Sequence, residues 1–297
     1  MTTAFVLSGG GSLGAVQVGM LQALAQQHIS PDLLVGTSAG AVNAVWVAQY
    51  GMSADSLTGL GHIWQQLRRR DVFPVRPTHV LGGLLGRAAA VSNSEHLGEM
   101  IRSHSQVGDL CDAAIPVHAL ATDLLTGVAA LISSGSPSDA VLASAAIPGI
   151  FPPRLLNGRW LIDGAFSTPS GVSHAVDLGA TEVYVLPAGV PCALVEAPRS
   201  ALGVAVHSIS FLIQQRLIAD LDHPPAGAVI HLLPPLCPVT VSAADFSHAT
   251  ELIERARQAS AKWLEEGGPD LPRPARFLSL HDHGGAATPS PVSYPAG

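Results

Sequence analysis

A recurring pattern of apolar runs and glycine-rich turns organises the N-terminal part of the chain. One short apolar run occupies residues 4–7 and another occupies residues 33–35, and each leads into a glycine-rich turn. After each turn, apolar residues recur at helical spacing, to about residue 27 in the first case and over residues 39–50 in the second. We therefore predict two strand–turn–helix units. Adjacent parallel strands would bring both turns to the same edge of one sheet.

The same alternation of strand and helix patterns continues through the rest of the chain. Strands are predicted over residues 117–122 and 128–133 (a hairpin pair), 159–162, 182–186 and 228–233. Helices are predicted over residues 56–70, 93–104, 139–146, 174–178, 199–221 and 247–266. Ser138 is expected to cap the helix at 139–146, and Asp245 or Ser247 the last helix. These elements predict an α/β fold with a mainly parallel central sheet flanked by helices.

The chain is predicted to form one domain over residues 1–266, followed by a flexible Pro- and Gly-rich tail over residues 267–297. Residues 72–90 fit neither periodicity, because they are apolar, broken by proline and glycine, and free of acidic residues. We interpret them as an irregular packed insertion, or alternatively as a cap that contacts acyl chains or a membrane surface. The preceding Arg68-Arg69-Arg70 is predicted to end the helix over residues 56–70, where positive charge favours the helix dipole.

Composition narrows the class of protein. The chain has 297 residues, of which 47% are hydrophobic and 12% charged, which excludes a disordered chain. The formal net charge of -7 argues against a nucleic-acid partner. Cys111, Cys192 and Cys237 are far apart and fit no disulfide or zinc framework, so we expect buried thiols in a reducing compartment. No basic leader precedes the first apolar run, which predicts a cytoplasmic protein.

The turn after the second predicted strand carries a candidate nucleophile. Gly36-Thr37-Ser38-Ala39-Gly40 matches the G-x-S-x-G pattern of a nucleophile elbow, a sharp turn from a strand into a helix. Gly36 and Gly40 suit such a turn because glycine tolerates unusual backbone angles. Ser38 would stand at the strand end, beside helix amides that favour developing negative charge. The alternative is a glycine-rich turn with an incidental serine.

The turn after the first predicted strand, residues 8–14, reads SGGGSLG. Its G-x-G-x-x-G matches the dinucleotide-binding fingerprint, but that motif needs an acidic residue at the end of the second strand, and Asp32 precedes that strand instead. A P-loop needs Gly-Lys-Ser/Thr, which this turn lacks. The remaining functional interpretation is an oxyanion hole, since consecutive glycines let amides converge on one oxygen. The candidate donors are Gly9, Gly10, Gly11 and Ser12.

A serine nucleophile needs a base that takes its proton. The histidines are scattered, and none follows a predicted strand in an obvious turn position. Asp163 follows the apolar Trp160-Leu161-Ile162 and precedes Gly164, so it is able to project from a strand end. Burial near a desolvated pocket would raise its basicity. The alternative is an ordinary turn aspartate, because Asp-Gly is a common turn pair.

Taken together, the three motifs resemble the patatin-like phospholipase family, in which they occur in this order. The resemblance covers roughly residues 3–187 and includes segments 121–123 and 143–153. It implies a Ser–Asp dyad without a catalytic histidine, with Ser38 as nucleophile, Asp163 as base and the amides of residues 10–12 as oxyanion hole. It also implies a three-layer α/β fold and hydrolysis of lipid acyl esters. The sequence departs from the family at Leu13, where relatives often carry Arg or Lys, and at residues 166–169, which lack an Asn before the proline.

We therefore predict a serine acyl-ester hydrolase that needs no metal and no other cofactor. Its expected partners are a lipid or other acyl-ester substrate and, transiently, a membrane surface, so the expected location is cytoplasmic with peripheral membrane contact. Two alternatives remain open at this point. One is a dinucleotide-dependent oxidoreductase, and the other is a catalytically weak lipid-binding module.

Overall fold

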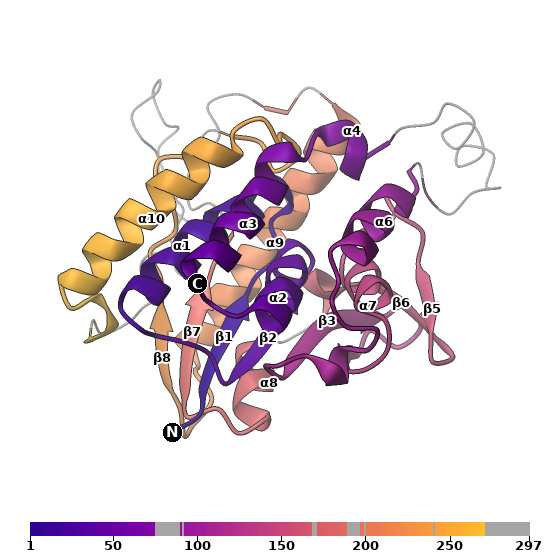
Figure 1. Ribbon diagram of the computed structural model, residues 1–297. Coiled ribbons are helices and arrows are strands. Elements are labelled where there is room, and N and C mark those ends of the chain that lie inside the picture. The colour runs from indigo at the N-terminus through magenta and orange to yellow at the C-terminus, as the bar shows by residue number, and fades with distance from the viewer. Residues whose placement is uncertain are drawn as a thin grey trace, which may run out of the picture.

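The computed structural model describes residues 1–74, 90, 92–167, 171–188, 197–198, 200–239 and 241–270. Within them an eight-stranded sheet has the order β5-β6-β3-β2-β1-β7-β8, with β4 paired to β3 (Figure 1). The strands are β1 (Thr3–Leu7), β2 (Leu33–Thr37), β3 (Val117–Asp123), β4 (Ala129–Ile132), β5 (Arg154–Leu156), β6 (Arg159–Asp163), β7 (Glu182–Leu186) and β8 (Val229–Leu232). The pairs among β1, β2, β3, β7 and β8 are parallel, whereas β4 and β6 run antiparallel to β3. This topology confirms the predicted α/β class and the mainly parallel sheet.

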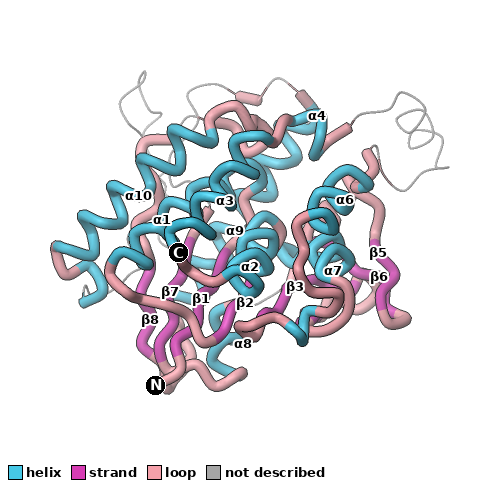
Figure 2. Tube along the Cα trace, in the orientation of Figure 1, coloured by secondary structure: helices cyan, strands magenta, loops and turns pink. Residues whose placement is uncertain are grey.

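Helices cover both faces of the sheet, so the molecule has three layers (Figures 1 and 2). One face carries α1 (Gly14–Gln26), α2 (Ala39–Tyr50), α3 (Ala54–Gln66), α6 (Glu95–Ser103), α7 (Pro137–Ser144) and α10 (Ala249–Glu265). The other face carries α8 (Val172–Asp177) and α9 (Ala201–Asp222). Within β1, Phe5 and Leu7 face the first layer and Ala4 and Val6 the second. Because both faces are covered, the strands are continuous apolar runs.

The last helix, α10, packs along α1 and brings the C-terminal part of the chain back to the turn after β1. At Gly19 of α1 a side chain would lie 2.6 Å from the backbone nitrogen of Arg257 and 2.9 Å from the Cβ of Ala256, so glycine allows this close approach. The segment that leads into α10 then covers the glycine-rich turn, where the N–H of Ser12 donates to the carbonyl of Ala243 at 2.8 Å. The first strand and the last helix therefore meet at one turn.

The three consecutive arginines do not end a helix, so that prediction is wrong. Helix α3 ends at Gln66, and Leu67 has extended backbone angles (φ -60°, ψ 138°). A short helix, α4 (Arg69–Val72), then begins with Arg68 as its N-cap. The carboxylate of Asp71 accepts the backbone N–H of Arg68 at 2.9 Å, and this bond starts a new helix in place of extending the old one.

The cap predicted for α7 is also wrong. The helix begins at Pro137, and Ser136 is the N-cap, with its hydroxyl accepting the N–H of Asp139 at 3.5 Å. Proline is favoured at the first helical position because a backbone N–H at that position has no acceptor within the helix, so proline loses nothing by lacking it. Ser138 instead donates its hydroxyl to the carbonyl of Gly98 at 3.1 Å, which joins α7 to α6.

Two further local predictions fail near the surface. His248 is the N-cap of α10 and makes no side-chain capping bond, while the carboxylate of Asp245 accepts both the N–H and the hydroxyl of Ser247. Cys111 and Cys237 are exposed, where buried thiols were expected.

Several predictions fall on parts of the chain outside the described residues. These parts include residues 75–89 and 91 of the predicted insertion or cap, and residues 271–297 of the predicted tail. Among the described helices, none combines the length and the apolar character that crossing a membrane takes.

Candidate active site

Ser38 lies at a sharp turn between β2 and α2. Its φ is 54° and its ψ is -119°, a positive-φ conformation that costs energy for a residue with a side chain. Neither Gly36 nor Gly40 leaves room for a side chain. A Cβ on Gly36 would lie 2.6 Å from the carbonyl oxygen of Gly40, and a Cβ on Gly40 would lie 2.6 Å from the carbonyl carbon of Leu7. The turn therefore has the geometry of the predicted nucleophile elbow.

A serine from another helix holds this elbow in place. The backbone N–H of Ser38 donates to the hydroxyl oxygen of Ser144, at the end of α7, at 2.9 Å. That hydroxyl in turn donates to the carbonyl of Leu120 in β3 at 2.6 Å. Ser144 is fully buried, so this chain of hydrogen bonds is shielded from water. Sequence reasoning did not find Ser144, because a serine in a small-residue helix carries no local sign of this role.

The sheet register brings Asp163 to Ser38. Strand β4 pairs with one edge of β3. Strands β2 and β6 both pair with the other edge, one after the other along β3, and they run toward each other. Thr37, the last residue of β2, pairs with Leu120, and Asp163, the last residue of β6, pairs with the next residue, Ala121. The ends of the two strands therefore meet, and Ser38 and Asp163 lie side by side.

Asp163 is a buried carboxylate, 1% exposed. Burial raises its pKa to about 6, although the N–H of Ala165 and the side chain of Ser38 both interact with the carboxylate and act to lower it. The Ala165 N–H donates to Oδ1 at 2.8 Å, and the Thr122 hydroxyl donates to the Asp163 carbonyl at 2.9 Å. The backbone amide of Asp163 donates to Ala146 at 3.0 Å. The carboxylate is thus held rigidly and is a stronger base than an ordinary aspartate.

The four predicted oxyanion donors divide into different roles. The N–H of Ser12 donates to Ala243, and its hydroxyl donates to the carbonyl of Ser242 at 3.1 Å, so this residue is committed elsewhere. The amides of Gly10 and Gly11 donate to no atom in the part of the chain that the structure describes. Gly11 has φ 58° and lines the same cavity as Ser38. These two amides therefore remain candidates for the predicted oxyanion hole.

A buried polar network joins the two glycine-rich turns. The Asn43 amide of α2 donates to the side-chain oxygen of Gln17 in α1 and to the carbonyl of Gly14, both at 2.9 Å. Gln17 donates to the carbonyl of Ser8 at 2.9 Å, and the indole of Trp64 donates to the Asn43 oxygen at 2.8 Å. Gln17 and Asn43 are fully buried. The network holds the turn after β1 against the helix that follows Ser38, and sequence reasoning missed it.

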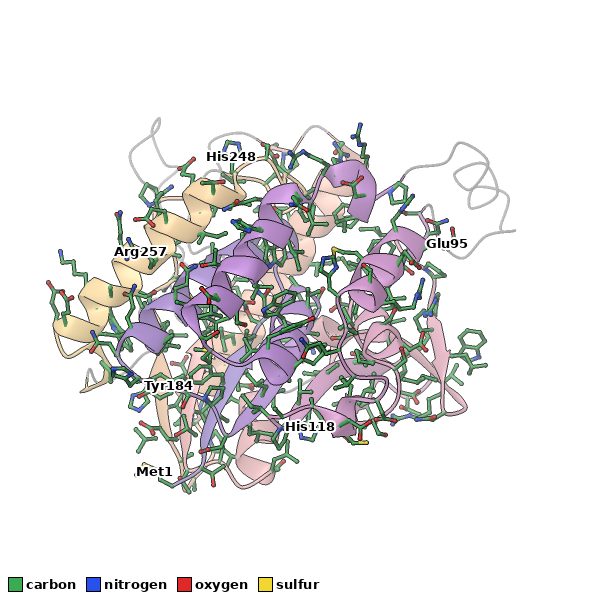
Figure 3. The ribbon with its side chains drawn as sticks, viewed as in Figure 1. Met1, Glu95, His118, Tyr184, His248 and Arg257 are labelled. Atoms are coloured by element: carbon green, nitrogen blue, oxygen red, sulfur yellow. The ribbon has the colours of Figure 1, made fainter. Side chains whose placement is uncertain are left out.

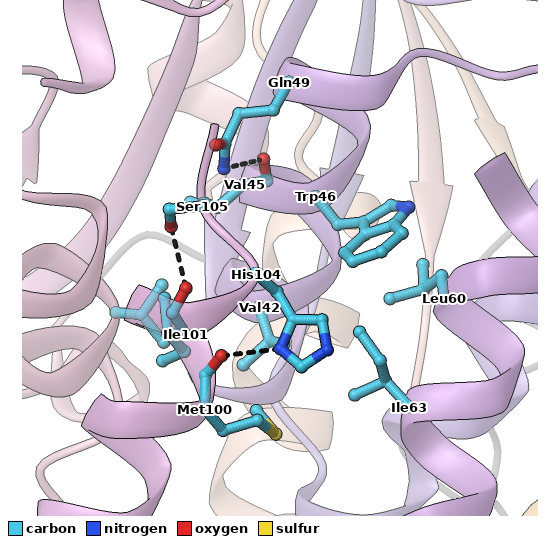
Figure 4. A pocket seen from close by; sticks show the side chains of 11 residues that line it. Val42, Val45, Trp46, Gln49, Leu60, Ile63, Met100, Ile101, His104 and Ser105 are labelled. Carbon is cyan, nitrogen blue, oxygen red and sulfur yellow. Dashed lines mark hydrogen bonds between the residues drawn. The ribbon is translucent and has the colours of Figure 1, made fainter. Parts of the chain in front are cut away.

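An apolar cavity of about 50 Å³ opens beside Ser38, and we call it the acyl cavity. It is lined by Gly11, Ser38 and Ala39 and by larger side chains that include Val42, Trp64, Phe73, Met100, Phe151 and Phe246. A second apolar cavity of about 30 Å³, the rear cavity, shares Val42 and Met100 with it (Figure 4). Trp46, Leu60 and Ile63 line the rear cavity, and His104 and Gln49 form its polar side.

A third cavity lies on the other side of the two turns. It has a volume of about 20 Å³ and is lined by Ser8, Gly9, Thr37, Leu120, Gly164, Ala165, Ser167, Arg216 and Leu217. Gly9, one of the predicted oxyanion donors, therefore faces this cavity, while Gly11 faces the acyl cavity. Among the described residues that line these two cavities there is no histidine. The described part of the chain also holds no group of three His, Cys, Asp or Glu side chains placed to bind a metal ion.

Comparison with known proteins identifies the family of the chain. Residues 5–176 match the family model described as Patatin-like phospholipase. The chain belongs to the patatin-like phospholipase family. The matched residues include both glycine-rich turns, Ser38 and Asp163, whereas α9 and α10 lie beyond them.

Relatives within the family share only part of their length with this chain. An uncharacterized NTE family protein of Mycobacterium bovis is 29% identical over 166 residues, which are 56% of this chain and 43% of that protein. Lysophospholipase nte1 of Aspergillus niger is 27% identical over 191 residues, 62% of this chain and 12% of that protein. Neuropathy target esterase sws of Drosophila melanogaster is also 27% identical over 191 residues, and the match covers 62% of this chain and 13% of that protein. The chain thus spans less than half the length of these relatives.

Among solved structures, VipD from Legionella pneumophila aligns with 89% of this chain and 67% of its own, at 13% identity and a TM-score of 0.45.

Proposed function

We propose that this protein is a serine acyl-ester hydrolase that acts on lipid substrates, with Ser38 as nucleophile and Asp163 as general base. One observation carries the proposal: a buried carboxylate with a pKa of about 6 lies beside a serine on a strained elbow, and that serine opens onto an apolar cavity. Membership of the patatin-like phospholipase family supports it. Relatives named lysophospholipase point to the same class of reaction.

In the first step, Asp163 takes the proton of the Ser38 hydroxyl while the serine oxygen attacks the ester carbonyl. A base with a pKa near 6 is ionised at neutral pH and still basic enough to accept this proton. The negative charge that develops on the carbonyl oxygen is stabilised by the free amides of Gly10 and Gly11. The ester C–O bond then breaks, Asp163 returns the proton to the leaving alkoxide, and the alcohol departs.

In the second step, water releases the acyl group from Ser38. Asp163 takes a proton from the water molecule, whose oxygen attacks the acyl carbonyl, and the same amides hold the oxyanion again. The bond to the serine oxygen breaks, the serine oxygen recovers a proton from Asp163, and a carboxylic acid leaves.

The acyl chain is expected to occupy the acyl cavity and, if long enough, to continue between Val42 and Met100 into the rear cavity (Figure 4). Both cavities are apolar near Ser38, and burial of each methylene favours binding by about 0.8 kcal/mol. A lipid acyl chain fits this lining, whereas a short polar acyl group does not.

Hydrolysis of a medium-chain ester tests the proposal. The wild-type protein is expected to release p-nitrophenol from p-nitrophenyl octanoate, and Ser38→Ala to lose that activity. Ser53→Ala is a matched control, because Ser53 caps α3 on the surface and its hydroxyl accepts the N–H of Ser56. Equal turnover by the wild-type protein and Ser38→Ala would contradict the proposal.

A further inference from the structure

Four of the described helices line both the acyl cavity and the rear cavity. On α6, Leu97 and Met100 line the acyl cavity, and Met100 and Ile101 line the rear cavity. The other three helices show the same progression along one face, from the acyl cavity to the rear cavity: Ala39 to Val45 on α2, Trp64 to Leu60 on α3, and Ala145, at the end of α7, to Val141. The two cavities therefore lie end to end between the same helices.

Helix α2 gives the length of this arrangement. Ser38 is the N-cap of α2, and Val42 and Gln49 follow on the same helix. At about 1.5 Å per residue, Val42 lies about 6 Å and Gln49 about 16 Å beyond Ser38 along the helix axis. An extended hydrocarbon chain advances about 1.3 Å per carbon, so it would meet Val42 after about five carbons and Gln49 after about twelve.

Val42 and Met100 line both cavities and therefore stand between them (Figure 4). The side chain of Val42 is β-branched and keeps one strongly preferred rotamer in a helix. Met100 is unbranched and has three rotatable bonds. Its carbonyl accepts the Ser103 hydroxyl at 2.9 Å and lies 2.8 Å from Nδ1 of His104, so its backbone is held. The side chain of Met100 is therefore the movable half of this partition.

Helix α6 lies on the outside of the molecule. Figure 3 shows its first residue, Glu95, at the surface, and His96 and Glu99 are also exposed. Met100 itself is only partly buried. A change of rotamer therefore costs less at Met100 than it would in the close-packed core.

The far end of the rear cavity is polar. The Gln49 amide donates to the carbonyl of Val45 at 3.0 Å (Figure 4), and its oxygen accepts the N–H of Gln106 at 2.7 Å. His104 lies on the same polar side. An acyl chain that reaches Gln49 leaves the apolar lining, so further carbons gain no comparable burial.

We propose that Met100 determines the acyl-chain length that the enzyme selects. Its side chain separates the two cavities and moves aside for chains of about ten to twelve carbons, whose ends then fill the rear cavity. This inference rests on the proposed hydrolase function and narrows its substrates to esters of such acids, in preference to esters of short-chain acids.

The direct test compares p-nitrophenyl decanoate with p-nitrophenyl butanoate. The ratio of their kcat/KM values measures the use of the rear cavity, because butanoate ends before Val42. Met100→Ala removes the partition and is expected to raise this ratio about 10-fold, since no methionine side chain has to be displaced and immobilised. Met100→Phe places a bulkier, less flexible ring in the passage and is expected to lower the ratio about 10-fold.

A second variant tests the rear cavity itself. Ile63→Phe fills this cavity from α3 and is expected to lower the ratio about 10-fold, with butanoate hydrolysis unchanged. Met52→Ala is the matched control for Met100→Ala. Met52 is also a partly buried methionine packed on the core, but it is not among the described residues that line either cavity. Its ratio should equal that of the wild-type protein.

Two results would overturn the proposal. One is that Met100→Ala and Met100→Phe both keep the wild-type ratio, including the case in which activity on the two esters declines in parallel through a structural effect. The other is an unchanged ratio in Ile63→Phe, because the chain would then not enter the rear cavity.

Fluorescence quenching separates this proposal from the hydrolase proposal, because Trp46 lines the rear cavity and bromine quenches an indole only at close range. In a Ser38→Ala background, 12-bromododecanoic acid is expected to quench Trp46, whereas 4-bromobutanoic acid is not. Trp46→Phe or Met100→Phe should abolish that quenching. This result, in a protein whose wild-type form hydrolyses neither ester, would support the chain-length proposal and contradict the hydrolase function. Hydrolysis of both esters without any effect of the Met100 variants on the ratio would contradict the chain-length proposal alone.

Discussion

The two glycine-rich turns at the ends of β1 and β2 have similar compositions and different local structures. In the turn after β2, the glycines leave room for neighbouring backbone because they have no side chain. One side chain, that of Ser38, is presented there in a strained conformation. In the turn after β1, the amides of Gly10 and Gly11 donate to no atom among the described residues, and the hydroxyl of Ser12 donates to the carbonyl of Ser242. The comparison shows that a glycine motif allows close approach and a sharp turn, while the surrounding contacts decide whether the turn presents a side chain or backbone amides.

The two turns also depend on different parts of the molecule. The Ser38 turn is fixed by Ser144 and Leu120, both within the family match. The other turn is fixed partly by Ala243 and Ser242, which lie in the segment before α10 and beyond that match. Ser38, the proposed nucleophile, is therefore held by residues of the family match, whereas the candidate oxyanion loop also contacts the C-terminal part of this chain.

The largest expected effect is the loss of activity when Asp163, the proposed base for Ser38, is replaced. Asp163→Asn should reduce kcat on p-nitrophenyl octanoate by about 10⁴-fold, because the amide is unable to accept the serine proton. Asp139→Asn is the control, since Asp139 is a half-exposed partner of Arg154. Activity of Asp163→Asn within 10-fold of wild type would show that Ser38 is activated by another group.

The next effect concerns the turn after β1. Gly11→Ala should lower kcat by about 10²–10³-fold, the usual cost of losing one oxyanion donor, because the new Cβ collides with the Ala243 carbonyl and displaces the loop. Gly51→Ala is a matched control: Gly51 also has a positive φ, 70°, but open space surrounds its Cβ position. Equal kinetic losses in the two variants would mean that backbone strain alone, and not an oxyanion site, explains the result.

Asp163 should also affect how the free energy of unfolding depends on pH. Its pKa is about 6 in the folded protein and near 4 in an unfolded chain, so ionisation destabilises the fold as the pH rises from about 4 to about 6. Asp163→Asn removes this cost and should raise the free energy of unfolding at pH 8 by about 3 kcal/mol. The gain should vanish at pH 4. Urea titrations of both proteins at the two pH values measure it, and a variant less stable at pH 8 would contradict burial of an ionised carboxylate.

The smallest effect is expected in the network that joins the two turns. Trp64→Phe keeps a ring in the acyl cavity but leaves the buried oxygen of Asn43 without its indole donor, which should cost about 1–3 kcal/mol in stability. Trp46→Phe is the control, because Trp46 is only partly buried and donates to Ser56. Thermal unfolding of both variants compares them, and an equal loss in the two would show that the network adds nothing beyond packing.

Much of the fold was predictable from local sequence patterns. Apolar runs predicted most of the strands, and the two glycine turns placed the first two strand–helix units correctly. The apolar run Trp160-Leu161-Ile162, followed by Asp163 and Gly164, also predicted that Asp163 lies at a strand end, and Asp163 is the last residue of β6. These features are local, since they depend on residues within a few positions of one another.

The supporting contacts were not predictable in the same way, because they join segments far apart in the sequence. Ser144 accepts the N–H of Ser38, and the carbonyl of Ala243 accepts the N–H of Ser12. The sequence around Ser144 or Ala243 does not indicate either contact. The helix break at Leu67 shows the same limit on a smaller scale, because the competing cap at Arg68 prevails over a continuous helical pattern. The place of Arg216 in the lining of the third cavity likewise follows only from the packing of α9.

The central claim is that Asp163 activates Ser38, and covalent labelling by a fluorophosphonate measures it most directly. Mass spectrometry of the labelled protein should locate the probe on Ser38. The labelling rate should rise as the pH passes about 6, where Asp163 ionises, and then level off. Asp163→Asn should label slowly at every pH. Labelling of Ser38 at equal rates in the wild-type protein and Asp163→Asn, or labelling of a different serine, would contradict the account.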